Sequence, residues 1–355
     1  MNRRSFISTG AQLSVLSAFP AASLAPSPSI DPLYNSKEIA TILPKKLNKG
    51  DTVGLIAPGY SLSSKALENA ISNVQAMGFK PYHTSRIKGR DGYFSNTDKL
   101  RAADVEEMFL DPQVDGIICA RGGYGCTRIL DLINYDYIAQ NPKVLVGFSD
   151  ITALANTIHR KTGLVTFHGP VATTLENTYN RDNLYRIITQ PKELFTIKSE
   201  HYTPEVVQSD DTFEQYVINP GVITAPLLGG NLSLLSAMCG TQYDLDYTGK
   251  LVFIEDIEED PYRIDRMFTQ LLSAPTFKHA AGIVLGVFKG CNEPKRVSFT
   301  LKEVILDRIK PLNIPSIYGF SIGHIDHNLT LPIGINATLN TDTFSIELLQ
   351  RAIQD

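Results

Sequence analysis

The sequence predicts an α/β protein of two domains, the first of them built on a doubly wound parallel sheet. The chain has 355 residues, which is long for a single domain. Its first half alternates short apolar segments with segments of helical periodicity. Parallel strands that are buried on both faces have this uniformly apolar character, and helices connect them.

The first domain is expected to alternate strand and helix throughout. Leu67, Ala70, Ile71 and Val74 share one face at helical spacing, after a cap at Ser63 or Ser64 and before a stop at Gly78. Further helices are expected at residues 97–110, 127–133 and 151–161. Strands are expected at residues 52–57, 80–83, 114–120, 144–148 and 165–167.

The second domain is also expected to be α/β. Helices are predicted at residues 231–239, 262–273 and 299–309, and strands at residues 250–254 and 282–288 and near Ile314 and Ile335. A tail rich in Gly and Pro suggests a compact barrel-like or swivelling sheet. The pattern loosens between the two domains, so we predict a first domain at residues 49–185, a linker at 186–218 and a second domain at 219–355.

The N-terminus resembles an export signal. Arg3 and Arg4 form a twin-arginine pattern, a mildly apolar stretch follows, and small residues around Ala25 suit a cleavage site. The alternative is a short amphipathic helix. We therefore expect a signal peptide at residues 1–25, a linker at 26–48 and a periplasmic location.

Composition excludes several classes of function. The net charge is −4 without a long Lys/Arg run, so no nucleic-acid partner is expected. The N-terminal apolar stretch is too short to cross a bilayer, which takes about 20 apolar residues, and no membrane anchor is expected. The four cysteines show no CxxC spacing, so we expect neither a metal site nor a disulfide framework, and no cofactor.

One glycine-dense turn, Gly122-Gly123-Tyr124-Gly125-Cys126, follows a predicted strand and precedes a predicted helix. Ligands of parallel sheets bind at this end of the strands. Such a turn can expose a nucleophile, and amides at the start of a helix favour a thiolate and can hold an oxyanion. A purely structural turn with a buried cysteine is the alternative.

A nucleophile needs a base and a group that orients the base. Of the seven histidines, His324 is the best placed, in a glycine-bounded loop directly after a strand. His168, which ends another strand, is second, and His327 suits a solvent-facing position. Glu255 is the first polar residue after a buried strand, and it is the carboxylate best placed to face a cleft. Spacing alone does not bring Cys126, Glu255 and His324 together.

Several blocks of the sequence form a recognisable series. In chain order they are Arg121-Gly122-Gly123-Tyr124-Gly125, Gly147-Phe148-Ser149-Asp150-Ile151-Thr152, Phe253-Ile254-Glu255-Asp256, Pro261-Tyr262-Arg263-Ile264-Asp265-Arg266, Gly323-His324 and Leu331-Pro332-Ile333-Gly334. Together these blocks resemble the LD-carboxypeptidase (muramoyltetrapeptide carboxypeptidase) family. The resemblance covers roughly residues 50 to 345. It implies a metal-free peptidase with a Ser-Glu-His triad between two domains, and a homodimer.

Carried onto this chain, the resemblance gives Glu255 as the carboxylate, His324 as the base and Cys126 at the nucleophile's position. Cys126 is then a working nucleophile, part of an impaired site, or part of a protein that binds muropeptides without cutting them. The first interpretation implies removal of the terminal D-alanine from murein tetrapeptides. Amides of Gly125 and Thr127 would hold the oxyanion, and the side chains expected to grip the substrate are Arg121, Ser149 and Asp150.

Two further functions stay open. A relative within the same family could hydrolyse a nucleotide-peptide antibiotic with the same triad. A glutamine amidotransferase-like domain would use a Cys-His-Glu set on a similar sheet, but the chain lacks a domain for an ammonia acceptor.

Overall fold

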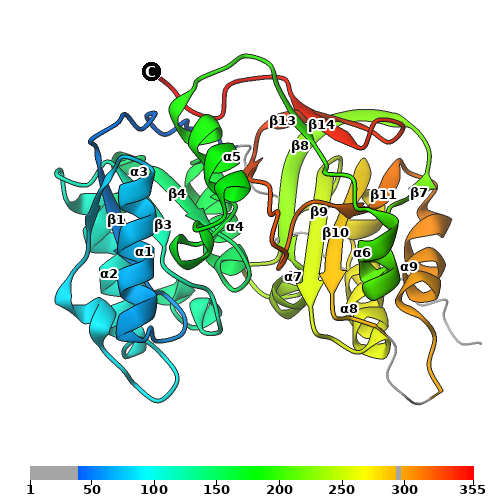
Figure 1. Cartoon of the computed structure of the whole chain (residues 1–355), viewed down its shortest axis with the longest axis horizontal. Helices are drawn as coiled ribbons and strands as arrows, with labels where there is room; N and C mark the ends of the chain where they lie inside the picture. The colour runs from blue at the N-terminus through cyan, green and yellow to red at the C-terminus, as the bar shows by residue number, and fades with distance from the viewer. Residues whose placement is uncertain (1–38, 293–296) are drawn as a thin grey trace, which may run out of the picture. The chain divides into compact units, whose positions relative to one another are not determined.

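A computed structural model describes residues 39–292 and 297–355 of the chain. The predicted signal peptide and the predicted linker up to residue 38 lie outside the described residues. Residues that follow residue 38 contact the folded chain: the amide of Ile42 donates to the carbonyl of Gly163 at 2.8 Å, and Leu47 is buried. Figure 1 colours the chain from blue to red along its length.

The predicted parallel sheet is present and carries the order β12-β5-β4-β3-β1-β2. Its parallel strands are β1 (Thr52–Ile56), β2 (Lys80–Tyr82), β3 (Gly116–Cys119), β4 (Val144–Gly147) and β5 (Thr166–His168). The strand β12 (Leu331–Ile333) comes from the predicted second domain and pairs antiparallel with β5. The two predicted domains therefore share this sheet.

Three helices of this region begin and end close to the predicted positions: α1 (Ser64–Ala76), α2 (Asp98–Leu110) and α4 (Ile151–Thr162). Two more, α3 (Tyr135–Gln140) and α5 (Thr178–Thr189), were not predicted. Ser63 and Thr97 cap α1 and α2, because each side-chain oxygen accepts a hydrogen bond from an amide in the first turn. The predicted cap of α1 at Ser63 is confirmed.

The helix predicted at residues 127–133 is wrong. Two short 3₁₀ turns occupy this stretch, Cys126–Arg128 and Leu130–Leu132, and α3 follows directly after them. So few residues between a tight turn and the next helix cannot complete several α-helical turns, and helix nucleation is costly over such a length. Cys126 therefore does not begin an α-helix.

The second sheet has the order β6-β14-β13-β8-β9-β10-β11-β7. Its strands are β6 (Phe195–Lys198), β7 (Tyr216–Asn219), β8 (Val222–Asn231), β9 (Leu251–Ile257), β10 (Gly282–Lys289), β11 (Ser316–Phe320), β13 (Asn336–Asn340) and β14 (Ser345–Leu348). In the middle of the sheet, β9 runs parallel to β8 and to β10, and β10 runs parallel to β11.

The second sheet is open, so the expected barrel-like closure is wrong. Its end strands β6 and β7 pair with β14 and β11 respectively and, within the described residues, not with each other. The helices are α6 (Pro204–Ser209), α7 (Leu232–Met238), α8 (Pro261–Ser273) and α9 (Leu301–Ile309). Helices α7, α8 and α9 lie where the periodicity predicted them.

The segment predicted as a linker at residues 186–218 contains the end of α5, then β6, α6 and most of β7, so it supplies the two end strands of the second sheet. Ile197 and Ile218 are buried while the residues beside them are more exposed, which is the alternation expected of edge strands. The polar, β-prone composition of the segment reflects this role rather than a connection between domains.

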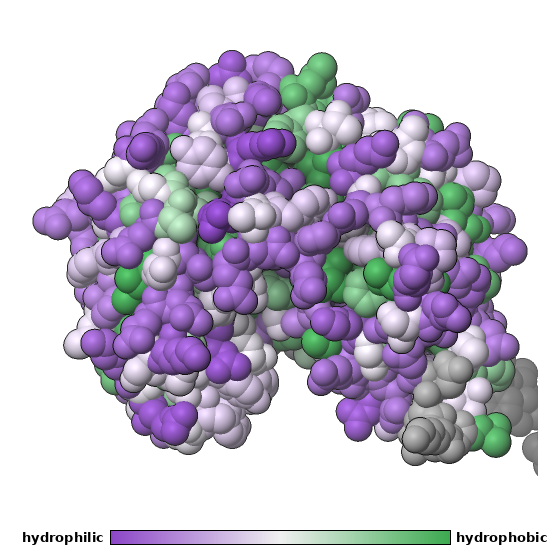
Figure 2. Space-filling model, in the orientation of Figure 1, coloured by the Kyte–Doolittle hydropathy of each residue, from purple (hydrophilic) through white to green (hydrophobic). Residues whose placement is uncertain are grey.

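Polar contacts join α4 of the first sheet to β8 of the second. Asn156 donates from its side-chain amide to the carbonyl of Gly229 at 2.8 Å, and the amide of Asn231 donates to the hydroxyl of Thr152 at 2.9 Å. On the face that Figure 2 presents, hydrophilic residues predominate and apolar residues form smaller groups. Among the described residues, no helix has both the length and the apolar character to cross a membrane.

Candidate active site

His324 and Glu255 form the best-defined polar pair of the site. Glu255 lies near the end of β9 and is fully buried, and its Oε2 is 2.8 Å from Nδ1 of His324. Burial alone would lower the pKa of His324, but the charge and hydrogen bond of Glu255 raise it above its ordinary value. Burial alone would raise the pKa of Glu255, but the charge and hydrogen bond of His324 lower it. The predicted pairing of these two residues is present.

Gly323 makes this close approach feasible. Its φ is +119°, and a Cβ built there would lie 3.0 Å from Oε2 and 3.1 Å from Cβ of Glu255. A larger residue would therefore push the loop, and with it His324, away from the carboxylate. The glycine-bounded loop that the sequence analysis singled out has this steric reason.

The loop between β4 and α4 lies against His324. The ring of Phe148 is 4.8 Å from the ring of His324, centroid to centroid. The next residue, Ser149, has φ +64°, one of few positive values at a non-glycine residue of the described chain. A serine held in a strained turn between a parallel strand and a helix is the geometry of a nucleophile elbow.

Cys126 has a different environment from the one predicted. Its side chain is fully buried, and burial, followed by the charge of Asp150, raises the pKa of its thiol well above the usual value. A protonated thiol without solvent contact is a poor nucleophile, and the 3₁₀ turn supplies no α-helix N-terminus to lower its pKa. This environment argues against the prediction of Cys126 as the nucleophile.

Asp150, which was expected to grip the substrate, stands at the N-cap position of α4. It is fully buried, makes no side-chain cap to α4, and accepts a hydrogen bond from the amide of Cys126 at 2.9 Å. Burial raises the pKa of Asp150 above its ordinary value, although the hydrogen bonds from Cys126 oppose the rise. Asp150 therefore ties the glycine-rich turn to the loop that carries Ser149.

The glycine-rich turn itself lies over Ser149. A Cβ built on Gly122 would be 3.1 Å from Cβ and 3.4 Å from Oγ of Ser149. Arg101, which the sequence analysis missed, is also buried and donates to the carbonyl of Gly125 at 2.9 Å. Its position within α2 offered no signal, because a buried arginine cannot be told from an exposed one by helical spacing.

The remaining predicted residues lie at the edge of the turn. Arg121 is partly buried and donates to the carbonyl of Ser61 at 3.0 Å, with its guanidinium 5.6 Å from the ring centre of Tyr60. Gly125 has φ +127°, and Thr127 is partly exposed within the 3₁₀ turn. The predicted role of Gly125 and Thr127 in holding an oxyanion required Cys126 as the nucleophile, so the burial of Cys126 also argues against this role.

A cavity of about 610 Å³ opens beside His324. Phe148 and His324 line it together with Glu176, Asp326 and several Asn and Ile side chains. Of the described residues that line it, none is Lys or Arg. His324 therefore faces this cavity, and the carboxylates that line it are those of Glu176 and Asp326.

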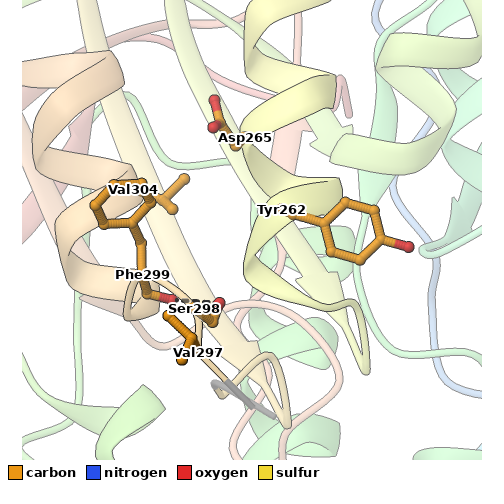
Figure 3. A pocket seen from close by; sticks show the side chains of 6 residues that line it. All are labelled: Tyr262, Asp265, Val297, Ser298, Phe299 and Val304. Carbon is orange, nitrogen blue, oxygen red and sulfur yellow. Dashed lines mark hydrogen bonds between the residues drawn. The ribbon is translucent and has the colours of Figure 1, made fainter.

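A second hollow, of about 560 Å³, is lined by Tyr262, Asp265, Val297, Ser298, Phe299 and Val304 (Figure 3). None of the predicted catalytic side chains lines it. Across residues 39–292 and 297–355, no three His, Cys, Asp or Glu side chains cluster closely enough to hold a metal ion.

Comparison with known families agrees with these features. Residues 53–169 match the N-terminal domain of LD-carboxypeptidases, and residues 224–339 match the C-terminal domain. A probable murein peptide carboxypeptidase of Bacillus subtilis is 40% identical over 300 residues, which cover 84% of this chain and 91% of that protein. The chain belongs to the LD-carboxypeptidase family.

Two other similar proteins have different names. The microcin C7 self-immunity protein MccF of Escherichia coli is 28% identical over 341 residues, or 87% of this chain and 96% of that protein. The crystal structure of an MccF-like protein from Bacillus anthracis superposes with a TM-score of 0.76 at 30% identity, covering 87% of this chain and all of that one. The matches support a hydrolase of the carboxypeptidase type with a mixed α/β fold.

Proposed function

We propose that the protein is an L,D-carboxypeptidase that removes the terminal D-alanine from murein tetrapeptides with Ser149, His324 and Glu255. The observation that carries the proposal is the positive φ of Ser149 next to Phe148, whose ring contacts His324. The position of Ser149 after β4 supports a nucleophile elbow. Its partial exposure contrasts with the complete burial of Cys126. The proposal therefore moves the nucleophile from sulfur to oxygen.

The base chemistry follows from the tautomer of His324. Its Nδ1 faces Glu255, so the neutral ring carries its proton there and leaves Nε2 as the acceptor. Nε2 takes the proton of the Ser149 hydroxyl as Oγ attacks the carbonyl that joins the diamino acid to D-alanine. The protonated ring then gives this proton to the departing amine, and water hydrolyses the resulting ester.

Backbone amides beside Ser149 supply donors for the oxyanion. The amides of Asp150 and Gly123 make no hydrogen bond within the described residues, and both belong to the segments that meet at Ser149. In elbows of this type, the amide after the nucleophile and one from a neighbouring loop hold the oxyanion. Removing one such donor typically costs about 10²–10³ in kcat.

The acidic cavity supports a cationic substrate group. Glu176 and Asp326 are both exposed and line the cavity next to His324. An ammonium group on the side chain of a diamino acid would be attracted there, whereas a second carboxylate would be repelled. Hydrolysis of a nucleotide-peptide antibiotic stays as the alternative, since the MccF relative is named for self-immunity to microcin C7. The second alternative is a protein that binds muropeptides without cleaving them.

The test is a direct assay of the purified protein on murein tetrapeptide and on an aminoacyl-nucleotide conjugate, with free D-alanine and free nucleotide measured separately. Release of D-alanine supports the proposal. Release of the nucleotide alone supports the antibiotic-hydrolysing relative, and tight binding without either product supports the non-catalytic protein.

We further propose that the protein is exported through the twin-arginine signal expected at residues 1–25. The paired Arg3 and Arg4 support this, because the pathway requires both. Replacing both with Lys should retain the protein inside the cell in a fractionation experiment, and unchanged export would contradict the proposal.

A further inference from the structure

His168 is a second histidine close to the candidate active site, and the proposed reaction does not use it. It ends β5 beside Gly147 of β4, and its side chain is buried, with 1% of its surface exposed. Its Nε2 has no hydrogen-bond partner within the described residues. A buried ring nitrogen without a partner costs about 1–3 kcal/mol, so this position is expected to have a compensating role.

The ring packing places His168 on one particular face of β9. Its centroid is 5.1 Å from the ring centroid of Phe253 and 6.1 Å from that of Phe148. Side chains two residues apart on a strand project to the same side, so Phe253 and Glu255 share a face. His168 therefore lies on the face of β9 from which Glu255 projects.

Glu255 has one oxygen that the pair with His324 does not use. Oε2 is 2.8 Å from Nδ1 of His324, whereas Oε1 is buried and has no partner within the described residues. The side-chain amide of Asn231 donates to Asp256 at 3.2 Å, and the proximity of the same amide contributes to lowering the pKa of Glu255. Nε2 of His168 and Oε1 of Glu255, both buried and without partners among the described residues, thus lie on the same face of β9.

We propose that His168 is a positioning residue, whose Nε2–H donates to Oε1 of Glu255, directly or through one water molecule, and fixes the carboxylate toward His324. The expected effect of His168 on turnover rests on the proposed function. In this arrangement Glu255 lies between two imidazoles, the buried ring of His168 and the ring of His324 that faces the cavity.

The electrostatics agree with a neutral His168. Burial lowers its pKa to about 4, although the negative charge of Glu255 opposes the fall. A neutral ring has one N–H and one acceptor nitrogen, so His168 can donate to a carboxylate without bringing a buried positive charge. His324 and Asp256 are the other titratable groups beside this pair.

Two substitutions separate positioning from packing. Gln places an amide N–H near the position of Nε2, so His168→Gln is expected to keep kcat within about threefold. His168→Leu has a similar volume without a donor and is expected to lower kcat about 10- to 100-fold with little change in KM, the range found for supporting residues. Melting temperatures of both variants serve as the control for folding.

A spectroscopic readout does not depend on the substrate. The Nδ1–H proton of His324, bonded to Glu255, should give a downfield proton resonance in the full-length protein and in His168→Gln. In His168→Leu it should broaden or move upfield, because the carboxylate is no longer held. If His168→Leu does not fold, His168→Asn, whose amide is too short to reach Oε1, takes its place.

An unchanged resonance and unchanged kcat in the folded donor-less variant would overturn the proposal. Absence of D-alanine release from the unmodified protein would instead overturn the proposed function. In that case the resonance still tests His168 alone, so the two failures are distinguishable.

Discussion

Two turns of the first sheet invite comparison, because each follows a parallel strand and each carries a side chain with nucleophilic chemistry. The turn after β3 has three glycines and ends at Cys126, and the turn after the neighbouring β4 has no glycine and carries Ser149. The first turn buries its side chain completely, whereas the second leaves its side chain partly exposed with φ +64°.

The difference lies in what the glycines do. In the first turn they let the backbone pass over Ser149, where a Cβ on Gly122 would lie 3.1 Å from Cβ of the serine. Asp150 then fixes that turn through the amide of Cys126. The glycine-dense turn thus packs over Ser149, the proposed nucleophile, and the strained non-glycine residue is the better marker of such a position.

The largest expected effect is at the second turn. Ser149→Ala should lower kcat for D-alanine release by about 10⁴-fold or more, since removing a nucleophile leaves only binding and oxyanion stabilisation. The melting temperature should stay close to that of the unmodified protein, because the hydroxyl is partly exposed. A variant that keeps more than a tenth of the activity would show that the second turn is not the elbow.

Glu255→Gln should have the next largest effect. The amide preserves the shape of the side chain but removes the charge that holds His324 in the required tautomer, so kcat should fall about 10³- to 10⁴-fold. Steady-state assays on folded protein measure this effect. A second glutamate close by in the sequence offers a matched control. Glu258→Gln, at an exposed position, should change kcat less than about threefold.

Asp150→Ala tests the connection between the two turns. It leaves the buried amide of Cys126 without its acceptor, which should reduce the free energy of unfolding by about 1–3 kcal/mol. Because the same loop carries Ser149, kcat should fall about 10- to 100-fold as well. Denaturant unfolding and D-alanine release give the two numbers, and a loss of stability without any loss of kcat would separate the turn from the site.

The pH dependence should reflect His324. Its pKa is raised above 6.5 by Glu255, with smaller contributions from Asp256 and Glu258, although burial opposes the rise. The base must be neutral to accept the serine proton, so kcat/KM should fall as the pH drops through this raised pKa. The acidic limb should therefore have its midpoint above 6.5, and a midpoint near 5 would argue against His324 as the base.

Much of the fold followed from local patterns. The cap at Ser63 and the apolar segments of β1 and β4 depend on neighbouring residues, and they were predicted close to their observed positions. The pairing of β12 with β5 joins segments more than a hundred residues apart, and nothing in the sequence of either strand specifies it. The open second sheet was missed for the same reason.

The candidate site was predicted in part. Glu255 was predicted to follow a buried strand and lies near the end of β9, and His324 follows β11; their positions relative to these strands and the family resemblance both selected them. Ser149 was assigned to substrate binding, because glycine density directed the search for an elbow to residues 122–126. The available signal was Gly147-Phe148-Ser149 at the end of an apolar strand and the start of a helix, which gives half of the Gly-x-Ser-x-Gly pattern. A positive φ at a serine cannot be read from sequence.

The most direct measurement compares D-alanine release by Cys126→Ala with release by the unmodified protein. The buried thiol makes no contact with the cavity beside His324, so the account predicts a kcat within about threefold and at most a small loss of stability, near 1 kcal/mol. A folded Cys126→Ala protein that loses activity as completely as Ser149→Ala would contradict it and return the nucleophile to the glycine-rich turn.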